Sequence, residues 1–280
     1  WQGDGVIDAL HSHLVTSSPP HPVIPSNLPA PLTPLIGRRH ELTALAALLA
    51  DPAHRLVTIL GPGGMGKSRL AVAAGHAARP DFPDGVFLVE LVALTVADEI
   101  PRAVGGSLGY PFQKDTRTPR QQILDYLRGR RLLLILDNCE HLLDAVDFFV
   151  DLLESAPGLR LLVTSRERLR MRAETVFRLE GLAYPPDGSI PQAGEDFGAI
   201  DLFVGSARRL RPDFAPEEDD LRAIRHIAHA VDGMPLALLL AASWSDLLTV
   251  GEIAQEVSRG VELLEADLRD LDPRHRSVSV

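Results

Sequence analysis

The chain has 280 residues, of which 45% are hydrophobic and 24% charged, and this composition is typical of a folded globular protein. Its net charge of −10 at pH 7 argues against direct nucleic-acid binding by this fragment, because phosphate contacts require a basic surface. The longest apolar run is too short to cross a bilayer and no signal segment opens the chain, so a cytoplasmic protein without membrane contact is expected. The single cysteine agrees with a reducing compartment.

The first residues predict a linker rather than a folded unit. Seven of the sixteen residues from 19 to 34 are proline, a composition that favours extended and weakly packed chain. We interpret residues 1–34 as the end of a preceding domain followed by this linker. Both ends of the chain are interpreted as cut sites, so effector and sensor domains of the same polypeptide are expected partners.

Residues 35–185 are expected to form one α/β domain. Short apolar runs rich in Leu, Ile and Val alternate with segments of helical periodicity, which predicts a parallel sheet with helices on both faces. Thr118 and Gln121 predict a capping box at the start of one of these helices. The five predicted strands span residues 55–60, 85–91, 131–136, 159–164 and 175–182, and the helices between them span 67–79, 99–108, 118–128 and 140–155.

After residue 199 the strand pattern disappears, and only helical periods remain. Residues 186–270 are therefore expected to form a small all-helical lid subdomain. Its predicted helices span residues 200–210, 217–231, 236–248 and 251–266.

A phosphate-binding loop is predicted directly after the first strand. Residues 61–68 fit the pattern G-x-x-x-x-G-K-[ST] between a strand and a helix, the context in which loop amides and a helix N-terminus bind phosphate. Lys67 is expected to reach the β- and γ-phosphates, and the Ser68 hydroxyl to ligate Mg²⁺. The predicted contacts with the nucleotide are Gly61, Pro62, Gly63, Gly64, Met65, Gly66, Lys67, Ser68 and Arg69.

A dinucleotide site and a GTP site are the two alternatives to this prediction. Gly61, Gly63 and Gly66 also match the dinucleotide fingerprint G-x-G-x-x-G, but that site has no use for a Lys-Ser pair and needs an acid about 20 positions on. Glu90, the nearest candidate, lies too far along the chain. ATP or ADP is favoured over GTP because no guanine-reading Asn/Thr-Lys-x-Asp segment surrounds either of the two lysines.

Three further residues are expected near the triphosphate. Asp137 ends a fully apolar strand, where a buried carboxylate calls for a cation, so it is predicted to ligate Mg²⁺; the alternative is that it caps the following helix. Glu140 is interpreted either as the group that polarises the attacking water or as a first-turn helix acid. Arg166 follows a neighbouring strand, from which an arginine can contact the γ-phosphate.

Five motifs, at residues 35–42, 61–68, 136–142, 164–166 and 233–237, together resemble the STAND class of signal-transducing P-loop NTPases. The resemblance is to the NB-ARC-like (AP-ATPase) branch found in bacterial multidomain regulators of transcription or signalling. It implies that Ile36, Gly37 and Arg38 line the adenine end of the pocket, that Arg166 is a sensor arginine, and that Pro235 contacts the base from the lid. It also implies that residues 271–280 are the truncated start of a winged-helix-like domain.

The resemblance implies an ATP/ADP-binding regulatory switch with slow Mg²⁺-dependent ATPase activity. Many NB-ARC sequences have two acids where this chain has Asp137 and Asn138, so the identity of the water-activating group stays open. A nucleotide-dependent homo-oligomer also stays open. The alternatives are a constitutive AAA-like remodelling ATPase and a non-hydrolysing scaffold that uses nucleotide for folding.

Overall fold

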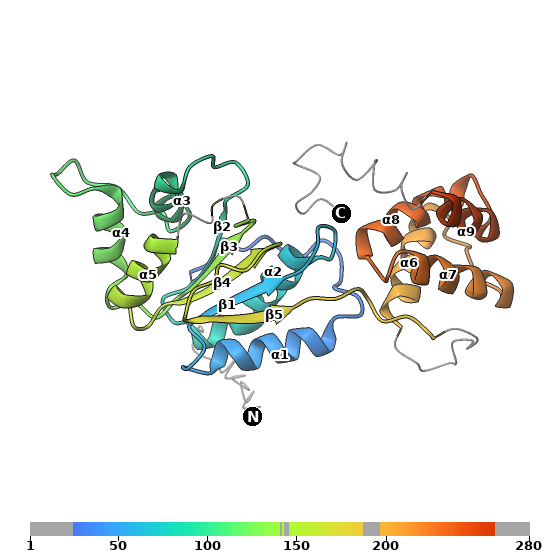
Figure 1. Ribbon diagram of the computed structural model, residues 1–280, viewed down its shortest axis with the longest axis horizontal. Helices are drawn as coiled ribbons and strands as arrows, with labels where there is room; N and C mark the ends of the chain where they lie inside the picture. Colours follow the sequence, from blue (N-terminus) through green and yellow to red (C-terminus); the bar gives the residue numbers. More distant parts are fainter. Residues whose placement is uncertain (1–24, 141, 143–145, 187–196, 261–280) are drawn as a thin grey trace, which may run out of the picture.

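The computed structural model describes residues 25–140, 142, 146–186 and 197–260 of the chain (Figure 1). Its centre is one five-stranded sheet in the order β2-β3-β4-β1-β5, in which every neighbouring pair is parallel. The prediction of a parallel five-stranded sheet is thereby confirmed. The strands are β1 (Leu56–Leu60), β2 (Val86–Glu90), β3 (Leu133–Asp137), β4 (Arg160–Ser165) and β5 (Glu174–Arg178).

Helices cover both faces of the sheet, which explains why its inner strands are apolar at successive positions. Within β3, Leu133 and Ile135 pack into the core beneath α1 and α2, whereas Leu134 and Leu136 pack into the core beneath the other three helices. One face carries α1 (Arg39–Ala50) and α2 (Lys67–Ala78); the other carries α3 (Ile100–Ser107), α4 (Pro119–Leu127) and α5 (Val146–Ser155). Short 3₁₀ turns at Arg79–Asp81 and Ala97–Glu99 connect these elements. We call the sheet and its five helices the body.

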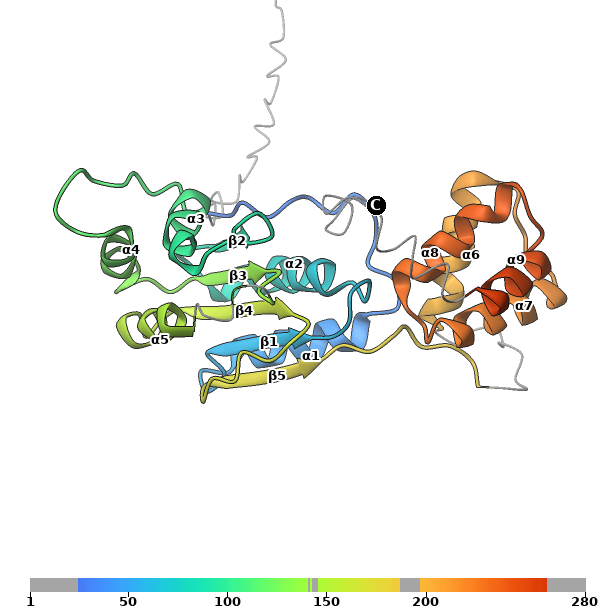
Figure 2. The same cartoon turned by 45° about the horizontal axis from the view of Figure 1, so that its top comes forward.

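The predicted elements recur with shifted ends. The capping box of α4 is present, since Gln121 N donates to Thr118 Oγ1 at 3.2 Å and Thr118 N donates to Gln121 Oε1 at 2.9 Å. β5 ends at Arg178 instead of residue 182, because its partner β1 ends at Leu60 and turns into the phosphate loop. Residues 179–183 leave the sheet as a strap toward the lid (Figure 2). The helix α1 was not predicted.

The described end of the proline-rich segment lies along the sheet edge. Val86 N donates to Pro25 O at 3.1 Å, and Ser26 forms an isolated parallel bridge with Val86. The Asn27 side chain accepts a hydrogen bond from Leu88 N at 2.7 Å and donates one to Leu88 O at 2.8 Å, as a paired strand residue would. This segment is therefore extended and hydrogen-bonded to the sheet edge, while Pro25, Ser26 and Asn27 stay exposed.

The lid is all-helical, as predicted, and has a core of its own. Phe203 of α6, Ile224 of α7, Leu238 of α8 and Ile253 of α9 are each fully buried within it. Both views place these helices beyond the carboxyl ends of the strands (Figures 1 and 2). The helices are α6 (Gly198–Leu210), α7 (Glu218–Ala230), α8 (Pro235–Ser243) and α9 (Val250–Arg259), with a 3₁₀ turn at Trp244–Asp246.

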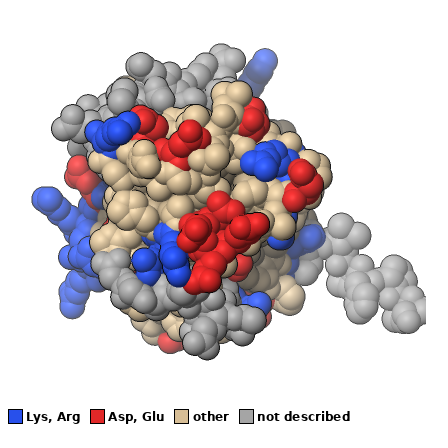
Figure 3. All heavy atoms as spheres, turned by 90° about the vertical axis from the view of Figure 1, so that its right-hand side faces the viewer, with Lys and Arg blue, Asp and Glu red and all other residues tan. Residues whose placement is uncertain are grey.

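The outer face of the lid carries charges of both signs (Figure 3). Acidic side chains gather near the centre of that view, with basic side chains to one side. α7 contributes three consecutive acids, Glu218, Asp219 and Asp220, to its own first turn, where negative charge is stabilised by the helix dipole. The face drawn there presents no continuous basic surface among the described residues.

Candidate nucleotide-binding site

The phosphate loop has the strand–loop–helix context that its motif requires. β1 ends at Leu60, and α2 begins at Lys67. Gly64 and Gly66 adopt φ values of 78° and 82°, a left-handed conformation that glycine adopts without strain. A Cβ on Gly61 would lie 2.7 Å from Leu179 O, so this loop also passes too close to the strap for a side chain.

Lys67 is the cation of this loop. Its Nζ donates to the carbonyl oxygens of Gly61 and Pro62, both at 2.9 Å. Burial lowers the pKa of its ammonium group; Glu140 and Asp137 oppose that shift, whereas Arg166 adds to it. The four side chains predicted to be catalytic come from three motifs and share one electrostatic environment.

Asp137 lies at the carboxyl end of β3, and only 5% of it is exposed. Thr164 Oγ1 donates to Asp137 Oδ1 at 2.5 Å and accepts a hydrogen bond from Asn138 N at 2.9 Å. Asp137 does not cap α5, whose described part begins at Val146. The contact of Thr164 with Asp137 was not predicted, although a threonine at the end of an apolar strand was the available signal.

Glu140 and Arg166 form an ion pair at the mouth of the loop. Arg166 Nε lies 3.1 Å from Glu140 Oε1, and a Cβ on Gly63 would lie 3.4 Å from Arg166 Nη2. The Glu140 side chain is 18% exposed, and its Oε2 is buried without a hydrogen-bond partner among the described residues. Glu140 lies in a turn and Leu142 is not helical, so Glu140 is not in the first turn of α5.

The residues predicted to line the adenine end lie at the junction of body and lid. The Ile36 side chain packs against the lid core, and a Cβ on Gly37 would lie 2.5 Å from Gly198 Cα at the start of α6. Pro235 is the first residue of α8, and the next amide, Leu236 N, donates to Gly64 O at 3.2 Å. The phosphate loop therefore contacts the lid directly, while contact of these residues with a base stays a prediction.

Two predicted ligand residues have other partners in this structure. The Arg38 guanidinium is buried and hydrogen-bonds to Glu41 Oε1 at 2.5 Å, Glu180 O at 2.7 Å and Met65 O at 3.4 Å, so it ties α1, the strap and the phosphate loop together. Arg69 Nη2 donates to Thr33 Oγ1 at 2.7 Å and to Pro34 O at 3.1 Å. Its side chain therefore holds the linker against α2.

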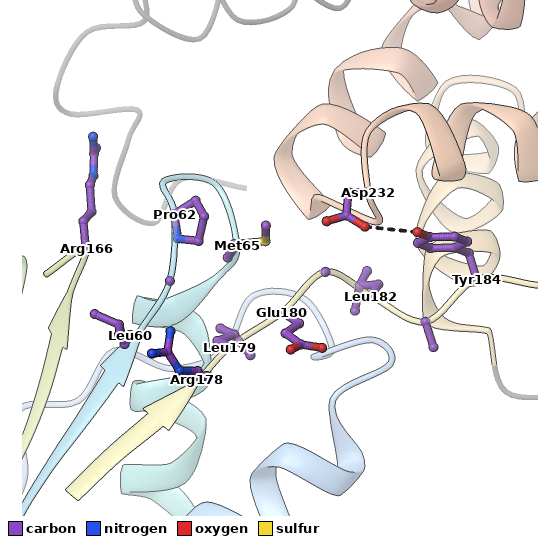
Figure 4. Close-up of a pocket in the computed structure, with 13 residues that line it drawn as sticks. Leu60, Pro62, Met65, Arg166, Arg178, Leu179, Glu180, Leu182, Tyr184 and Asp232 are labelled. Atoms are coloured by element: carbon purple, nitrogen blue, oxygen red, sulfur yellow. Dashed lines mark hydrogen bonds between the residues drawn. The ribbon is translucent and has the colours of Figure 1, made fainter. Parts of the chain in front are cut away.

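A cavity of about 800 Å³ opens beside the loop, between body and lid (Figure 4). Arg166 and Arg178 border it from β4 and β5, while Tyr184 and Asp232 border it from the lid side and are joined by a hydrogen bond of 3.0 Å. Its volume falls in the range of small-ligand sites. Gly61, Pro62 and Met65 line it, whereas Lys67, Ser68 and Asp137 lie outside its lining.

Comparison with known proteins finds a family match for the part of the chain that contains this loop. Residues 51–172 match the family model of an AAA domain. These residues have the P-loop NTPase fold and are similar to AAA domains. The domain contains the phosphate loop, Asp137, Glu140 and Arg166, and a P-loop AAA domain implies nucleotide binding.

Relatives of the chain include regulators. It is 39% identical over 227 residues to a Mycobacterium tuberculosis protein named only as uncharacterized, covering 79% of this chain and 53% of that protein. It is 32% identical to a candidate HTH-type transcriptional regulator of the same organism, covering 84% of this chain and 25% of the regulator. The regulatory protein AfsR of Streptomyces griseus is 31% identical, with 87% and 25% covered. The chain thus spans between a quarter and about half of the length of these relatives.

Solved structures share the fold of the NTPase domain and its lid. A STAND protein with a tetratricopeptide repeat sensor from Pyrococcus horikoshii has a TM-score of 0.50 and 18% identity, over 85% of this chain and 34% of that one. The Aeropyrum pernix ORC2 protein has a TM-score of 0.52 and 16% identity, over 81% and 68% of the two chains. Among the described residues, no helix is long and apolar enough to cross a membrane.

Proposed function

We propose that this chain is an ATP/ADP-binding regulatory switch with slow Mg²⁺-dependent ATPase activity. The observation that carries the proposal is the direct hydrogen bond between Gly64 O of the phosphate loop and Leu236 N of the lid. A loop that holds phosphate is thereby joined to a separately folded subdomain, so a change in the loop shifts the lid without any intermediate element.

The side chains at the site fit this chemistry. The left-handed glycines and the N-terminus of α2 suit phosphate oxygens, and Lys67 supplies a positive charge to them. Ser68 and the buried Asp137 offer the oxygen ligands that Mg²⁺ prefers. Glu140 would orient a water for attack on the γ-phosphate, and Arg166 would contact that phosphate from β4.

The relatives supply the regulatory context. Two of them are named as regulators, and both are about four times longer than the part that matches this chain. We therefore propose that effector and sensor domains of the same polypeptide respond to the lid, that nucleotide state also governs self-association, and that this fragment does not itself bind nucleic acid. The NB-ARC-like assignment, with Pro235 and residues 36–38 at the base, belongs to the same proposal.

The test is nucleotide content and affinity. We expect the purified chain to carry ADP or ATP, and Lys67→Ala to lose it with at least about a hundredfold weaker binding, since a phosphate-bound lysine contributes several charge-assisted contacts. Lys114→Ala is the matched control, because Lys114 is the other lysine of the chain and lies exposed in the loop before α4. Nucleotide retained by Lys67→Ala, or lost equally from both variants, would contradict the proposal.

The turnover rate separates the alternatives. A switch is expected to hydrolyse ATP far more slowly than once per second, whereas steady turnover on the order of one per second or faster would indicate a remodelling ATPase. Tight ATP binding without any phosphate release over hours would indicate a nucleotide-stabilised scaffold. A phosphate-release assay under multiple-turnover conditions distinguishes the three.

A further inference from the structure

The ion pair between Arg166 and Glu140 joins two groups that the proposed function assigns to different tasks. Glu140 is to orient a water, and Arg166 is to contact the γ-phosphate. Yet the two side chains form an ion pair, with Arg166 Nε 3.1 Å from Glu140 Oε1. The same guanidinium lies against Gly63 of the phosphate loop, where a Cβ would be 3.4 Å from its Nη2.

Arg166 is exposed enough to reach either Glu140 or a bound γ-phosphate. Its side chain is 53% exposed, while that of Glu140 is only 18% exposed, so the arginine is the more accessible half of the pair. Glu140 raises the pKa of Lys67 and Arg166 lowers it, so both charges act on the loop lysine. A γ-phosphate bound by Lys67 would therefore compete with Glu140 for the same guanidinium.

One carboxylate oxygen of Glu140 is left without a hydrogen bond among the described residues. This oxygen, Oε2, is buried, an arrangement that is costly for a carboxylate. Oε1 is engaged by Arg166. When Arg166 leaves Glu140, the carboxylate needs a new hydrogen-bond donor. A water at the loop would supply it.

We propose that Arg166 exchanges partners with nucleotide state: it pairs with Glu140 when ADP is bound and moves to the γ-phosphate when ATP is bound. The exchange rests on the proposed function and adds a regulation to it. With ADP, the arginine holds Glu140 away from a catalytic role. With ATP, the departure of the guanidinium frees the carboxylate to accept a hydrogen bond from water.

The exchange predicts how far each variant shifts the ratio of ATP affinity to ADP affinity. In the wild type, ATP must displace Arg166 from Glu140, and this lowers ATP affinity but not ADP affinity. A half-exposed ion pair of this kind corresponds to roughly a fivefold change in an equilibrium constant. Glu140→Gln should therefore raise the preference for ATP over ADP about fivefold, and Arg166→Met should lower it.

The experiment measures dissociation constants for ADP and a non-hydrolysable ATP analogue, both with Mg²⁺, on four proteins: wild type, Glu140→Gln, Arg166→Met and the double variant. Removing a negative charge near a polyanion strengthens binding by itself, so the double variant is the control. The exchange predicts that Glu140→Gln raises the ATP preference more in the wild-type background than in the Arg166→Met background, where only the charge effect remains.

Two results would overturn the exchange. An equal gain in both backgrounds would mean that Glu140 acts only through its charge, and no gain in the wild-type background would mean that the pair does not compete with ATP. Failure of the proposed function would look different, because the wild type would then bind neither nucleotide. Thermal unfolding of the four proteins checks that each is folded.

Discussion

The core of the body is held by packed side chains, whereas its junction with the lid is formed by closely approaching backbones. In the body, side chains fill the space between sheet and helices, and residues such as Leu134 and Ile135 are fully buried among others of their kind. At the junction, backbones meet instead. Cβ atoms added to Gly37 and Gly181 would lie 2.5 Å from Gly198 Cα and 1.9 Å from Asp232 O.

The difference shows where a conformational change can pass between body and lid. A packed core tolerates small rearrangements of side chains, whereas a backbone crossing has no side chain to adjust. The lid is held by few contacts, among them the hydrogen bonds from Leu182 N to Gly233 O and from Leu236 N to Gly64 O. Its position should therefore depend on the phosphate loop more than on the core.

The largest effect on the free energy of unfolding is expected from a methyl group added at the junction. Gly181→Ala places its Cβ within 1.9 Å of Asp232 O, so the strap or the α7–α8 turn must move. We expect a loss of at least about 3 kcal/mol in unfolding free energy, or detachment of the lid at lower cost. Urea unfolding and hydrogen exchange of α8 distinguish these outcomes.

Gly106→Ala is the control for that variant. Gly106 lies in α3 with no atom within 4 Å of an added Cβ, so alanine should stabilise the chain by up to about 1 kcal/mol. If both substitutions had the same small effect, the junction would not be as close as described.

The next largest effect is expected at Arg38. Arg38→Met keeps the length of the buried chain but leaves Glu180 O and Met65 O without this donor. We expect a loss of about 2 kcal/mol and faster hydrogen exchange in the strap, with slow exchange retained in β3. The exposed Arg128, whose ion pair with Asp125 spans 3.3 Å, gives the matched Arg128→Met variant, which should cost below about 0.5 kcal/mol.

A pH-dependent effect is expected inside the body. Burial, the main cause, raises the pKa of the Cys139 thiol to about 12 from a usual value of 9.0. The unfolded chain then loses its thiol proton at lower pH than the folded chain, so this stabilisation is complete below pH 9 and is lost between pH 9 and 12. At pH 10 the loss is about 1–2 kcal/mol. Unfolding of Cys139→Ala should lack this component; parallel pH profiles for the two proteins would contradict the assignment.

The smallest effect is expected at the outer edge of the sheet. Asn27→Ala removes both hydrogen bonds to Leu88, which lie at an exposed edge, and should cost about 0.5–1 kcal/mol. Asn27→Asp retains the acceptor for Leu88 N and should cost less. Hydrogen exchange at Leu88 reports the change directly.

The sequence predicts the body better than the junction, for a physical reason. Strand and helix periods reflect which side chains meet a core, so β1 to β5 and the lid helices follow from them. The phosphate loop and Asp137 follow from motifs with a local mechanism. The close approach of Gly37 to Gly198 and the hydrogen bond from Arg38 to Glu180 O each join residues more than 140 positions apart, and no local pattern encodes them.

α1 and Thr164 were missed for different reasons. α1 begins without a side-chain cap and buries only Leu45 and Leu49 fully, so its periodicity is weak. The role of Thr164 depends on Asp137 of the neighbouring strand, 27 positions earlier.

The most direct test of the account uses the fact that the chain has only two lysines. Both are labelled with an amine-acylating reagent, with and without MgADP or a non-hydrolysable MgATP analogue, and quantified by mass spectrometry. The account predicts that either nucleotide protects Lys67 strongly and leaves the exposed Lys114 unchanged. Unprotected Lys67, or equal protection of both lysines, would contradict nucleotide binding at the phosphate loop.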